Sequence, residues 1–384
     1  MKNVSRIIPC CAADTSGVCS ALYELGGMTV VHDASGCNST YATHDEPRWY
    51  DMHSMIFISA LTELDAILGD DEKLIADVTA AAHDLRPRFI AVCGSPMPMM
   101  TGTDFDAAAA EIERRTGIRT LAMHTNGTHS YIPGASEAFC AIAKEYVRPA
   151  AETVPGGVNI LGATPLDLGL TGTAESLRAW LRESGFRVVS CFAMGDKLDS
   201  LMQAASAQVN LVISQTGLAA AQYLYDAFGI PYVCGLPVGA QFSAVIAKAL
   251  RSAAKTGTCS FPCAQGNSAA HGAVTVIGES IISGSVAAEA AMQTGKPVRV
   301  ICPLPFDAAC MNGVTESPAS EEEIARDLAG NPPETVIADP LYRYILPQGT
   351  RHMELPHFAF SGRCFDRRIP DLCGKQFASF IKEI

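Results

Sequence analysis

Residues 272–278 read Gly-Ala-Val-Thr-Val-Ile-Gly, an apolar run of strand length that ends at a glycine turn. A helical pattern, Ser283–Thr294, follows it. The same order recurs after Pro155-Gly-Gly157, where Val-Asn-Ile-Leu leads through a loop to the helical pattern Thr173–Ser184. Strands that are apolar throughout and alternate with helices are typical of parallel sheets covered on both faces. The sequence therefore predicts an α/β fold.

The same alternation extends outward from these two stretches over the whole chain. The expected strands are Met28–Asp33, Arg88–Cys93, Arg119–Met123, Val158–Leu161, Arg187–Phe192, Leu211–Ser214, Pro231–Cys234, Ala273–Ile277, Val298–Cys302 and Thr335–Ala338. The other expected helices are Asp71–Asp84, Asp104–Thr116, Ser136–Tyr146, Leu218–Phe228 and Ala240–Thr256. The expected N-caps are Thr103, Thr173 and Ser283, and the expected helix ends are Gly117, Gly185, Gly229 and Gly295. The strand–turn–helix pattern begins again at two places, which divides the chain into three expected doubly wound, Rossmann-like domains, residues 1–155, 156–268 and 269–384.

Composition argues against several classes of protein. The 384 residues include 28 Lys and Arg against 40 Asp and Glu, so the net charge is −12, and no basic block would bind nucleic acid or an anionic membrane. No apolar run reaches the ~18 residues that a membrane-spanning helix needs. The N-terminal apolar run is interrupted at Asp14, short of a signal peptide, so a cytoplasmic location is expected. The absence of a Walker A sequence and of a complete Gly-x-Gly-x-x-Gly after a strand argues against ATP or NAD binding in this chain.

The chain contains 14 cysteines, a number that indicates buried thiols together with a metal or iron–sulfur site in a reducing compartment. Four of those in the first domain lie just past an apolar run: Cys10, Cys11, Cys37 and Cys93. Ligand sites form beyond the carboxyl ends of parallel strands, and four thiolates are the usual ligands of a 4Fe–4S cluster. Spacing alone leaves core packing open, because Cys191, Cys234 and Cys302 also end strands without a supporting motif.

The segments around three of these cysteines carry a family resemblance. Residues 30–41 read Val-Val-His-Asp-Ala-Ser-Gly-Cys-Asn-Ser-Thr-Tyr, residues 63–69 read Glu-Leu-Asp-Ala-Ile-Leu-Gly, and residues 92–96 read Val-Cys-Gly-Ser-Pro. Together with Cys11 they resemble the nitrogenase component 1 family, which includes the dark-operative protochlorophyllide and chlorophyllide reductases. The resemblance implies that Cys11, Cys37 and Cys93 ligate an iron–sulfur cluster near an interface between two related subunits. The cluster would be 4Fe–4S or a larger one like the P-cluster, and Cys10 would replace Cys11 or supply a fourth ligand.

The resemblance also assigns residues to a second, ligand-binding position. Ser214 stands where nitrogenase has a cofactor-ligating Cys, and His357 approximates the position of its ligating His. Losing the soft thiolate removes a ligand that iron–sulfur cofactors favour, so dinitrogen reduction is not expected. A further metal or a tetrapyrrole is the ligand expected near Ser214, and His32 and Tyr41 are also expected to contact it.

Titratable residues close to the cysteines are the expected catalytic groups. His44, Glu46 and Arg48 lie on the loop after Cys37, where the family has substrate-side residues. A His or a carboxylate beside a cluster would deliver protons alongside electrons, and His357 is expected to share this role. The alternatives that stay open are a solvated turn for residues 44–48 and a core histidine for His357.

The function implied by the resemblance is that of a reductase component. Electrons would come from a separate ATP-dependent iron protein with its own P-loop and would reduce an organic substrate. That substrate would be a tetrapyrrole, as in the nickel-sirohydrochlorin reductive cyclase, or a small unsaturated or sulfur-containing compound. The chain is expected to form a homodimer or to pair with a homologous subunit.

Two other functions remain open from the sequence. One is a non-catalytic scaffold or carrier for metal-cluster assembly, which the extra cysteines at 259, 263, 302 and 310 would fit. The other is a cluster-free small-molecule binding protein of the periplasmic-binding type, which the interrupted N-terminal apolar run disfavours.

Overall fold

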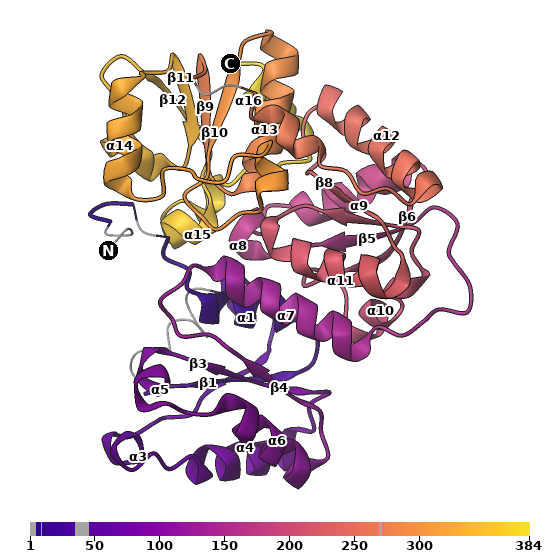
Figure 1. Ribbon diagram of the computed structural model, residues 1–384, viewed down its shortest axis with the longest axis vertical. Helices are drawn as coiled ribbons and strands as arrows, with labels where there is room; N and C mark the ends of the chain where they lie inside the picture. Colours follow the sequence, from indigo (N-terminus) through magenta and orange to yellow (C-terminus); the bar gives the residue numbers. More distant parts are fainter. Residues whose placement is uncertain (1–4, 9, 35–45, 269–270) are drawn as a thin grey trace.

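The computed structural model describes residues 5–8, 10–34, 46–268 and 271–384. The described strands form three parallel sheets of four strands each, in the orders β2-β1-β3-β4, β6-β5-β7-β8 and β10-β9-β11-β12 (Figure 1). In each sheet the first strand along the chain therefore lies between the second and the third. This is the order of a doubly wound sheet, in which ligands bind beyond the carboxyl ends of the strands. The predicted α/β fold is confirmed.

Each sheet and its helices form one unit, and the three units follow one another along the chain. The first unit contains α1 (Asp14–Leu22), β1 (Met28–His32), η1 (Pro47–Tyr50), β2 (Met55–Ile58), α3 (Glu63–Leu68), α4 (Glu72–Leu85), β3 (Ile90–Gly94), α5 (Pro96–Thr101), α6 (Phe105–Thr116), β4 (Thr120–Met123) and α7 (Tyr131–Tyr146). The second unit contains β5 (Gly157–Leu161), α8 (Pro165–Leu168), α9 (Thr173–Glu183), β6 (Arg187–Cys191), α10 (Leu198–Met202), η2 (Ala204–Ser206), β7 (Val209–Val212), η3 (Gln215–Gly217), α11 (Leu218–Phe228), β8 (Tyr232–Cys234), α12 (Gln241–Thr256) and η4 (Pro262–Gly266). The third unit contains β9 (Val274–Ile277), α13 (Ser280–Thr294), β10 (Val298–Ile301), η5 (Ala308–Met311), α14 (Glu321–Gly330), β11 (Thr335–Ala338), η6 (Pro340–Tyr344), β12 (Arg351–Glu354), α15 (Phe358–Ser361), η7 (Gly362–Cys364), η8 (Asp366–Arg368) and α16 (Lys375–Ile381).

Two strands were not expected from the sequence, β2 and β12, and both lie at sheet edges. β12 reads Arg-His-Met-Glu and buries only Met353, so it carries no apolar run. The three expected N-caps were also wrong. The helices begin after Asp104, Gly172 and Glu279, because the side chains of Asp104 and Glu279 accept backbone N–H groups of the first turn.

Helix α1 was missed because its small and polar residues do not form an apolar stripe. All nine of its residues are nevertheless buried. It packs closely on α7, since a Cβ on Gly17 would lie 2.2 Å from the carbonyl O of Tyr131, and one on Gly134 would lie 2.0 Å from that of Asp14. Glycine at both positions therefore lets the two backbones approach one another.

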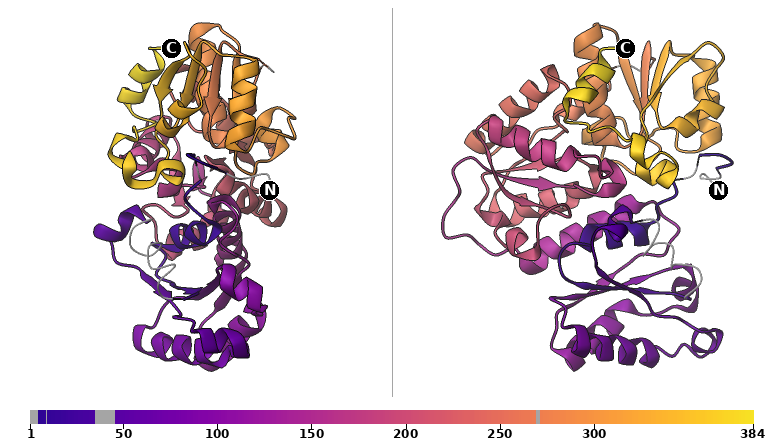
Figure 2. Two further views of the ribbon diagram at one scale, coloured as in Figure 1. Left: turned by 90° about the vertical axis from the view of Figure 1, so that its left-hand side faces the viewer. Right: turned by 180° about the vertical axis from the view of Figure 1, so that it is seen from behind.

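The units contact one another through long-range backbone hydrogen bonds and shared cores. The segment before α1 leaves the first unit and lies beside the third, where the N–H of Cys11 donates to the carbonyl O of Ala359 at 2.8 Å (Figure 2). Helix α7 packs against α11 and η3 of the second unit. In the described part of the chain, no helix is both long and apolar enough to cross a membrane.

Candidate functional site

The carboxyl end of β3 places Cys93 inside the first unit. Its side chain is fully buried, and the thiol donates to the carbonyl O of Val30 at 3.6 Å. A hydrogen bond with the Cys19 thiol of α1, together with burial, raises the pKa of Cys93 well above its ordinary value. At neutral pH this thiol is therefore protonated, and a metal bound there would have to displace the proton.

His32 ends the neighbouring strand β1. Its Nδ1 lies 2.7 Å from Ser59 Oγ, and burial lowers its pKa to about 4. His32 is thus a neutral imidazole at physiological pH. A neutral ring bonded to a hydroxyl can exchange a proton with its partner but carries no charge to attract an anion.

Three buried hydroxyl groups without hydrogen-bond partners lie on α1 and just after β3, and α1 contacts β3. Thr15 Oγ1 and Ser16 Oγ in α1 and Ser95 Oγ just after β3 have no hydrogen-bond partner. The Asp14 carboxylate ties the two elements together, because it accepts the N–H of Gly127, which lies against Pro96. Buried donors that lack acceptors fit a polar inorganic group such as an iron–sulfur cluster, whose sulfurs accept hydrogen bonds.

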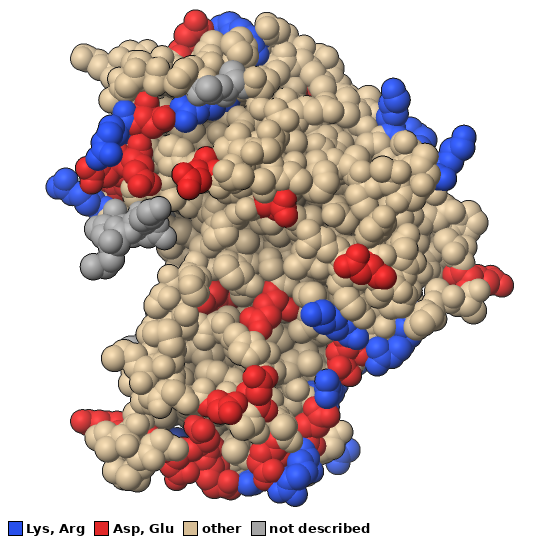
Figure 3. Space-filling model, in the orientation of Figure 1, with Lys and Arg blue, Asp and Glu red and all other residues tan. Residues whose placement is uncertain are grey.

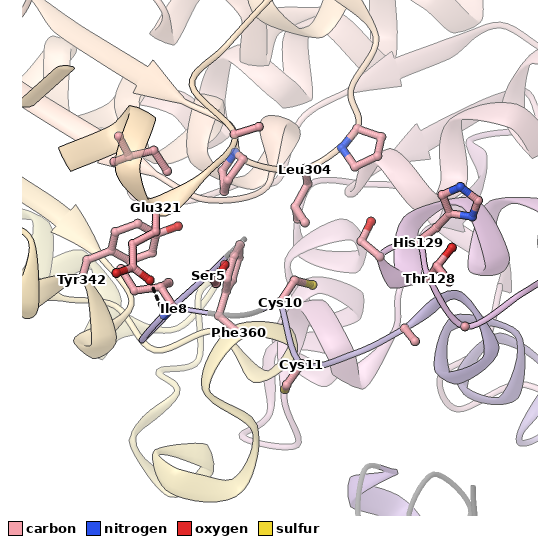
Figure 4. A pocket seen from close by; sticks show the side chains of 17 residues that line it. Ser5, Ile8, Cys10, Cys11, Thr128, His129, Leu304, Glu321, Tyr342 and Phe360 are labelled. Carbon is pink, nitrogen blue, oxygen red and sulfur yellow. Dashed lines mark hydrogen bonds between the residues drawn. The ribbon is translucent and has the colours of Figure 1, made fainter. Parts of the chain in front are cut away.

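Cys10 and Cys11 lie on the segment that leads into α1, beside the third unit. Cys11 is exposed, and its Sγ is 3.8 Å from the carbonyl O of Phe358. Cys10 is half-buried, its thiol donates to the carbonyl O of Ala12, and burial raises its pKa to about 12, with Cys11 contributing. Both line a cavity of about 500 Å³ (Figure 4). Cys93 does not line this cavity.

The rest of the cavity lining comes from the first and third units. It includes the loop 127–130 before α7, the segment 303–305 after β10, and the side chains of Glu321, Tyr342 and Phe360. In Figure 4 the Cys10 side chain lies between Leu304 and Cys11, and His129 and Thr128 lie to one side of it. The volume falls in the range of small-molecule sites, ~300–1,000 Å³.

Ser214 and His357 meet at a buried carboxylate that the sequence analysis did not single out. Asp167 of α8 accepts a hydrogen bond from Ser214 Oγ at 2.6 Å and another from the Tyr131 hydroxyl. His357 Nε2 lies 3.3 Å from the same carboxylate, although neither ring nitrogen makes a hydrogen bond. One carboxylate thus collects side chains from all three units. Neither Ser214 nor His357 lines the cavity beside Cys10.

A second buried acid, Glu279, stands next to this network. It follows β9 and caps α13 by accepting the N–H groups of Ile281 and Ile282, and it also accepts that of Gln215 in the second unit. Burial and the nearby charge of Asp167 raise the pKa of Glu279 to about 7. The junction of the units therefore holds a second buried acid, Glu279, whose ionisation burial and the Asp167 charge oppose.

Glu46 and Arg48, expected as catalytic residues, form a buried ion pair. The Arg48 Nε is 2.7 Å from Glu46, and one terminal nitrogen is 2.8 Å from Glu24. The remaining N–H groups reach the carbonyl O atoms of Ser20 and of Ala193 in the second unit, each at 2.7 Å. Both side chains of the pair are at most 4% exposed. This arrangement favours a positioning role that joins the first two units.

Three of the expected site residues, Cys37, Tyr41 and His44, lie outside the described residues. In the part of the chain that the structure describes, no group of three or more His, Cys, Asp and Glu side chains is arranged to hold a metal ion. The assignment of Cys11, Cys37 and Cys93 to one cluster therefore stays a prediction.

Sequence reasoning missed Asp167, Tyr131 and Glu279. Glu279 and Asp167 each follow a buried strand within a few residues, which was the available signal. Their association depends on packing between units, since Tyr131 and Asp167 are 36 residues apart.

Comparison with known proteins shows the family to which the chain belongs. Residues 15–293 match the family described as nitrogenase component 1 type oxidoreductase, so the chain belongs to that family and the resemblance inferred from the sequence is confirmed. The chain is similar to the nitrogenase iron-molybdenum cofactor biosynthesis protein NifE of Clostridium pasteurianum, at 27% identity over 46% of this chain and 38% of that protein. It is also similar to a subunit of the light-independent protochlorophyllide reductase of Prosthecochloris aestuarii, at 27% identity over 55% of this chain and 40% of that protein.

The matched region spans about 40% of the length of these relatives. Among solved structures, nitrogenase Cp1 at pH 6.5 superposes with a TM-score of 0.68 at 14% identity, over 100% of this chain and 94% of the other. A second structure, nitrogenase Cp1 at pH 5, gives a TM-score of 0.63 at 15% identity, over 92% and 85% of the two chains. These likenesses support the fold.

Proposed function

We propose that this protein is the iron–sulfur component of a nitrogenase-like reductase that acts on an organic substrate and not on dinitrogen. The observation that carries the proposal is the set of buried, partnerless hydroxyls of Thr15, Ser16 and Ser95, on α1 and just after β3, two elements that contact each other next to Cys93. Hydroxyls in such a site are satisfied when an acceptor-rich group binds there. Family membership and the names of the relatives support the same chemistry.

Cys11, Cys37 and Cys93 would hold the cluster, with Cys10 as the substitute or fourth ligand. A bound cluster supplies electrons one at a time. The protein would exclude water from Cys93 by burying it in the first unit. Cys10 lies at the wall of the cavity, and as a ligand its thiol would have to give up the proton that burial makes it hold.

The cavity beside Cys10 is the place we assign to the substrate. Its volume of about 500 Å³ and its mixture of hydroxyl, carboxylate and aromatic groups suit an organic molecule with polar substituents. Ser214 supplies no thiolate at the junction, and its hydroxyl already donates to Asp167. Those two facts favour an organic substrate over a second permanent metal cofactor.

A separate iron protein with its own P-loop would deliver the electrons. A surface suited to this partner lies on the two short helices that follow β2 and β3, α3 and α5, which contact each other. We call it the α3–α5 surface, and its exposed apolar side chains are Leu64, Ile67, Leu68, Met99 and Met100. Acidic side chains gather around the lower end of the first unit (Figure 3). An apolar centre with an acidic rim fits a partner whose own rim is basic.

The test is anaerobic purification with iron and sulfide analysis of the wild type and its variants. Wild type is expected to carry an oxygen-sensitive cluster, and Cys11→Ala and Cys37→Ala are expected to lose most of its iron and its visible absorbance. Cys364→Ala is the matched control, because Cys364 is exposed like Cys11 and belongs to no proposed ligand set. Wild type without iron, or Cys37→Ala with a full complement, would refute the proposal.

The second candidate is a scaffold on which a metal cluster is assembled, which the similarity to the cofactor biosynthesis protein favours. Turnover separates the two. A reductase consumes reductant in proportion to substrate when a cognate iron protein and ATP are present. A scaffold instead transfers its iron to an acceptor protein without consuming substrate.

Light scattering on the same samples tests the proposed homodimer, because self-pairing would double the mass of the chain.

A further inference from the structure

The N-terminal segment, residues 5–8 and 10–13, carries two of the candidate cluster ligands, Cys10 and Cys11, along the third unit. It leads directly into α1 of the first unit, and Figure 2 shows it between these two units. The other described candidate ligand, Cys93, lies in β3 inside the first unit. The placement of Cys10 and Cys11 relative to Cys93 therefore depends on how the third unit holds the N-terminal segment.

One carboxylate of the third unit holds the start of this segment. Glu321 Oε2 accepts three successive backbone N–H groups, those of Arg6, Ile7 and Ile8, at 2.9, 2.8 and 3.0 Å. Successive N–H groups that surround one oxygen form a binding site for an anion, and the first turn of α14, where Glu321 lies, also favours a negative charge. Partial burial opposes ionisation, but the three hydrogen bonds outweigh it and lower the pKa of Glu321. The carboxylate is therefore ionised at neutral pH.

The other end of the segment is held by the backbone. The N–H groups of Cys11 and Ala12 both donate to the carbonyl O of Ala359, at 2.8 and 3.3 Å. Between the two attachments, Ile8 is 6% exposed and packs in the hydrophobic core of the second and third units. Cys10 thus lies between a side-chain attachment and a backbone attachment. The side-chain attachment is the one that a substitution can remove.

The carboxylate of Glu321 and the thiol of Cys10 also line the same cavity of about 500 Å³. Figure 4 shows Cys10 between Glu321 on one side and His129 on the other, with Ser5 and Ile8 close to Glu321. Hydrogen bonds to a charged acceptor are stronger than those between neutral groups. Loss of the carboxylate would therefore release the start of the segment and change the place of Cys10 on the cavity wall.

We propose that Glu321 is a positioning residue that fixes Cys10 and Cys11 beside the cavity, in the place where they would ligate the cluster. It acts through three backbone N–H groups and not through contact with the cluster. The ligand role of the two cysteines rests on the proposed function, whereas their attachment does not. The neighbouring Glu322 is the matched control, because its side chain is 82% exposed and pairs with Arg326 at 2.8 Å on the surface of α14.

The first experiment uses the full chain after iron has been removed with a chelator. It measures hydrogen–deuterium exchange of the N-terminal peptide and the rate of alkylation of Cys10 by iodoacetamide, with the exposed Cys364 as internal reference. Glu321→Ala should raise both rates by about 10-fold or more, because the hydrogen bonds to a charged group are lost. Glu321→Gln keeps an acceptor oxygen and should lie between wild type and Glu321→Ala, and Glu322→Ala should behave as wild type does. Unchanged rates in Glu321→Ala would overturn the proposal.

The second experiment uses anaerobically purified protein that carries iron. The electron paramagnetic resonance spectrum and the midpoint potential of the cluster should change in Glu321→Ala, return part of the way in Glu321→Gln and stay as in wild type in Glu322→Ala. Faster exchange with an unchanged spectrum and potential would show that Glu321 only attaches the segment, which contradicts the positioning role. Wild type without iron would refute the proposed function, and the alkylation rate of Cys10 would then decide the present inference.

Discussion

Replacing Arg48 with Met is expected to lower the free energy of unfolding by about 3–5 kcal/mol, the usual cost of breaking a buried ion pair. The substitution leaves the carboxylates of Glu46 and Glu24, 2% and 10% exposed, without their cation. It also removes the donors to the carbonyl O atoms of Ser20 and Ala193. Arg48→Lys keeps the charge but offers three donors in a different geometry, so about half of that loss is expected.

The assay is denaturant unfolding of anaerobically purified protein, followed by circular dichroism. Arg114→Met is the matched control: Arg114 pairs with Glu111 on the surface at 2.6 Å, and its loss should leave the midpoint within experimental error. The reasoning is refuted if Arg48→Met unfolds at the same denaturant concentration as Arg114→Met. If Arg48→Lys instead keeps its stability but loses turnover per folded molecule, the catalytic role expected from the sequence is correct.

Two further predictions follow from the junction and from the α3–α5 surface. Burial and Asp167 raise the pKa of Glu279 from 4.5 to about 7, so the folded protein holds this proton more tightly than the unfolded chain does. The contribution of the protonated Glu279 to the free energy of unfolding is therefore fully present below pH 4.5 and is lost as the pH rises through about 7. Glu279→Gln should flatten the decline of the unfolding midpoint across that window, and an unchanged slope would contradict the assignment. Ile67→Lys and Met100→Lys should weaken binding of the iron protein by about 10-fold or more, measured by surface plasmon resonance, because both side chains are exposed on the proposed contact. Tyr344→Lys, at an exposed position in the third unit, is the control and should bind as wild type does.

The sequence predicted correctly those strands that are buried on both faces of their sheet. Strands such as β3 and β9 are buried at every residue, so they carry continuous apolar runs that stand out from their surroundings. β2 and β12 lie at sheet edges and each bury only one residue fully, which weakens the same signal. Helix α1 was missed although it is fully buried, because its close packing on α7 requires small residues in place of the large apolar ones that mark a buried helix.

The candidate site was predictable only in part. Strand-end positions indicated Cys93, and the family resemblance placed Ser214 and His357 together, where the structure has them on one carboxylate. The carboxylate itself, Asp167, could not be inferred, since its three neighbours come from distant segments that meet only after the units pack. The role of Arg48 could not be predicted either. Its position on a loop suggested that the side chain is exposed to solvent or substrate, whereas its contacts with the first two units bury it.

The hydrogen bonds at the junction support the cavity beside Cys10 as the proposed substrate site. In this chain the hydroxyl of Ser214 is committed to Asp167, and Asp167 also accepts from Tyr131. A ligand entering between Ser214 and His357 would have to break these hydrogen bonds and leave a buried carboxylate unsatisfied, at a cost of ~1–3 kcal/mol or more for each lost contact. The cavity beside Cys10 demands no such loss, and its walls come from the first and third units. The polar network around Asp167 therefore stabilises the packing of the three units against one another. We expect the substrate to bind in the separate cavity beside Cys10 and Cys11.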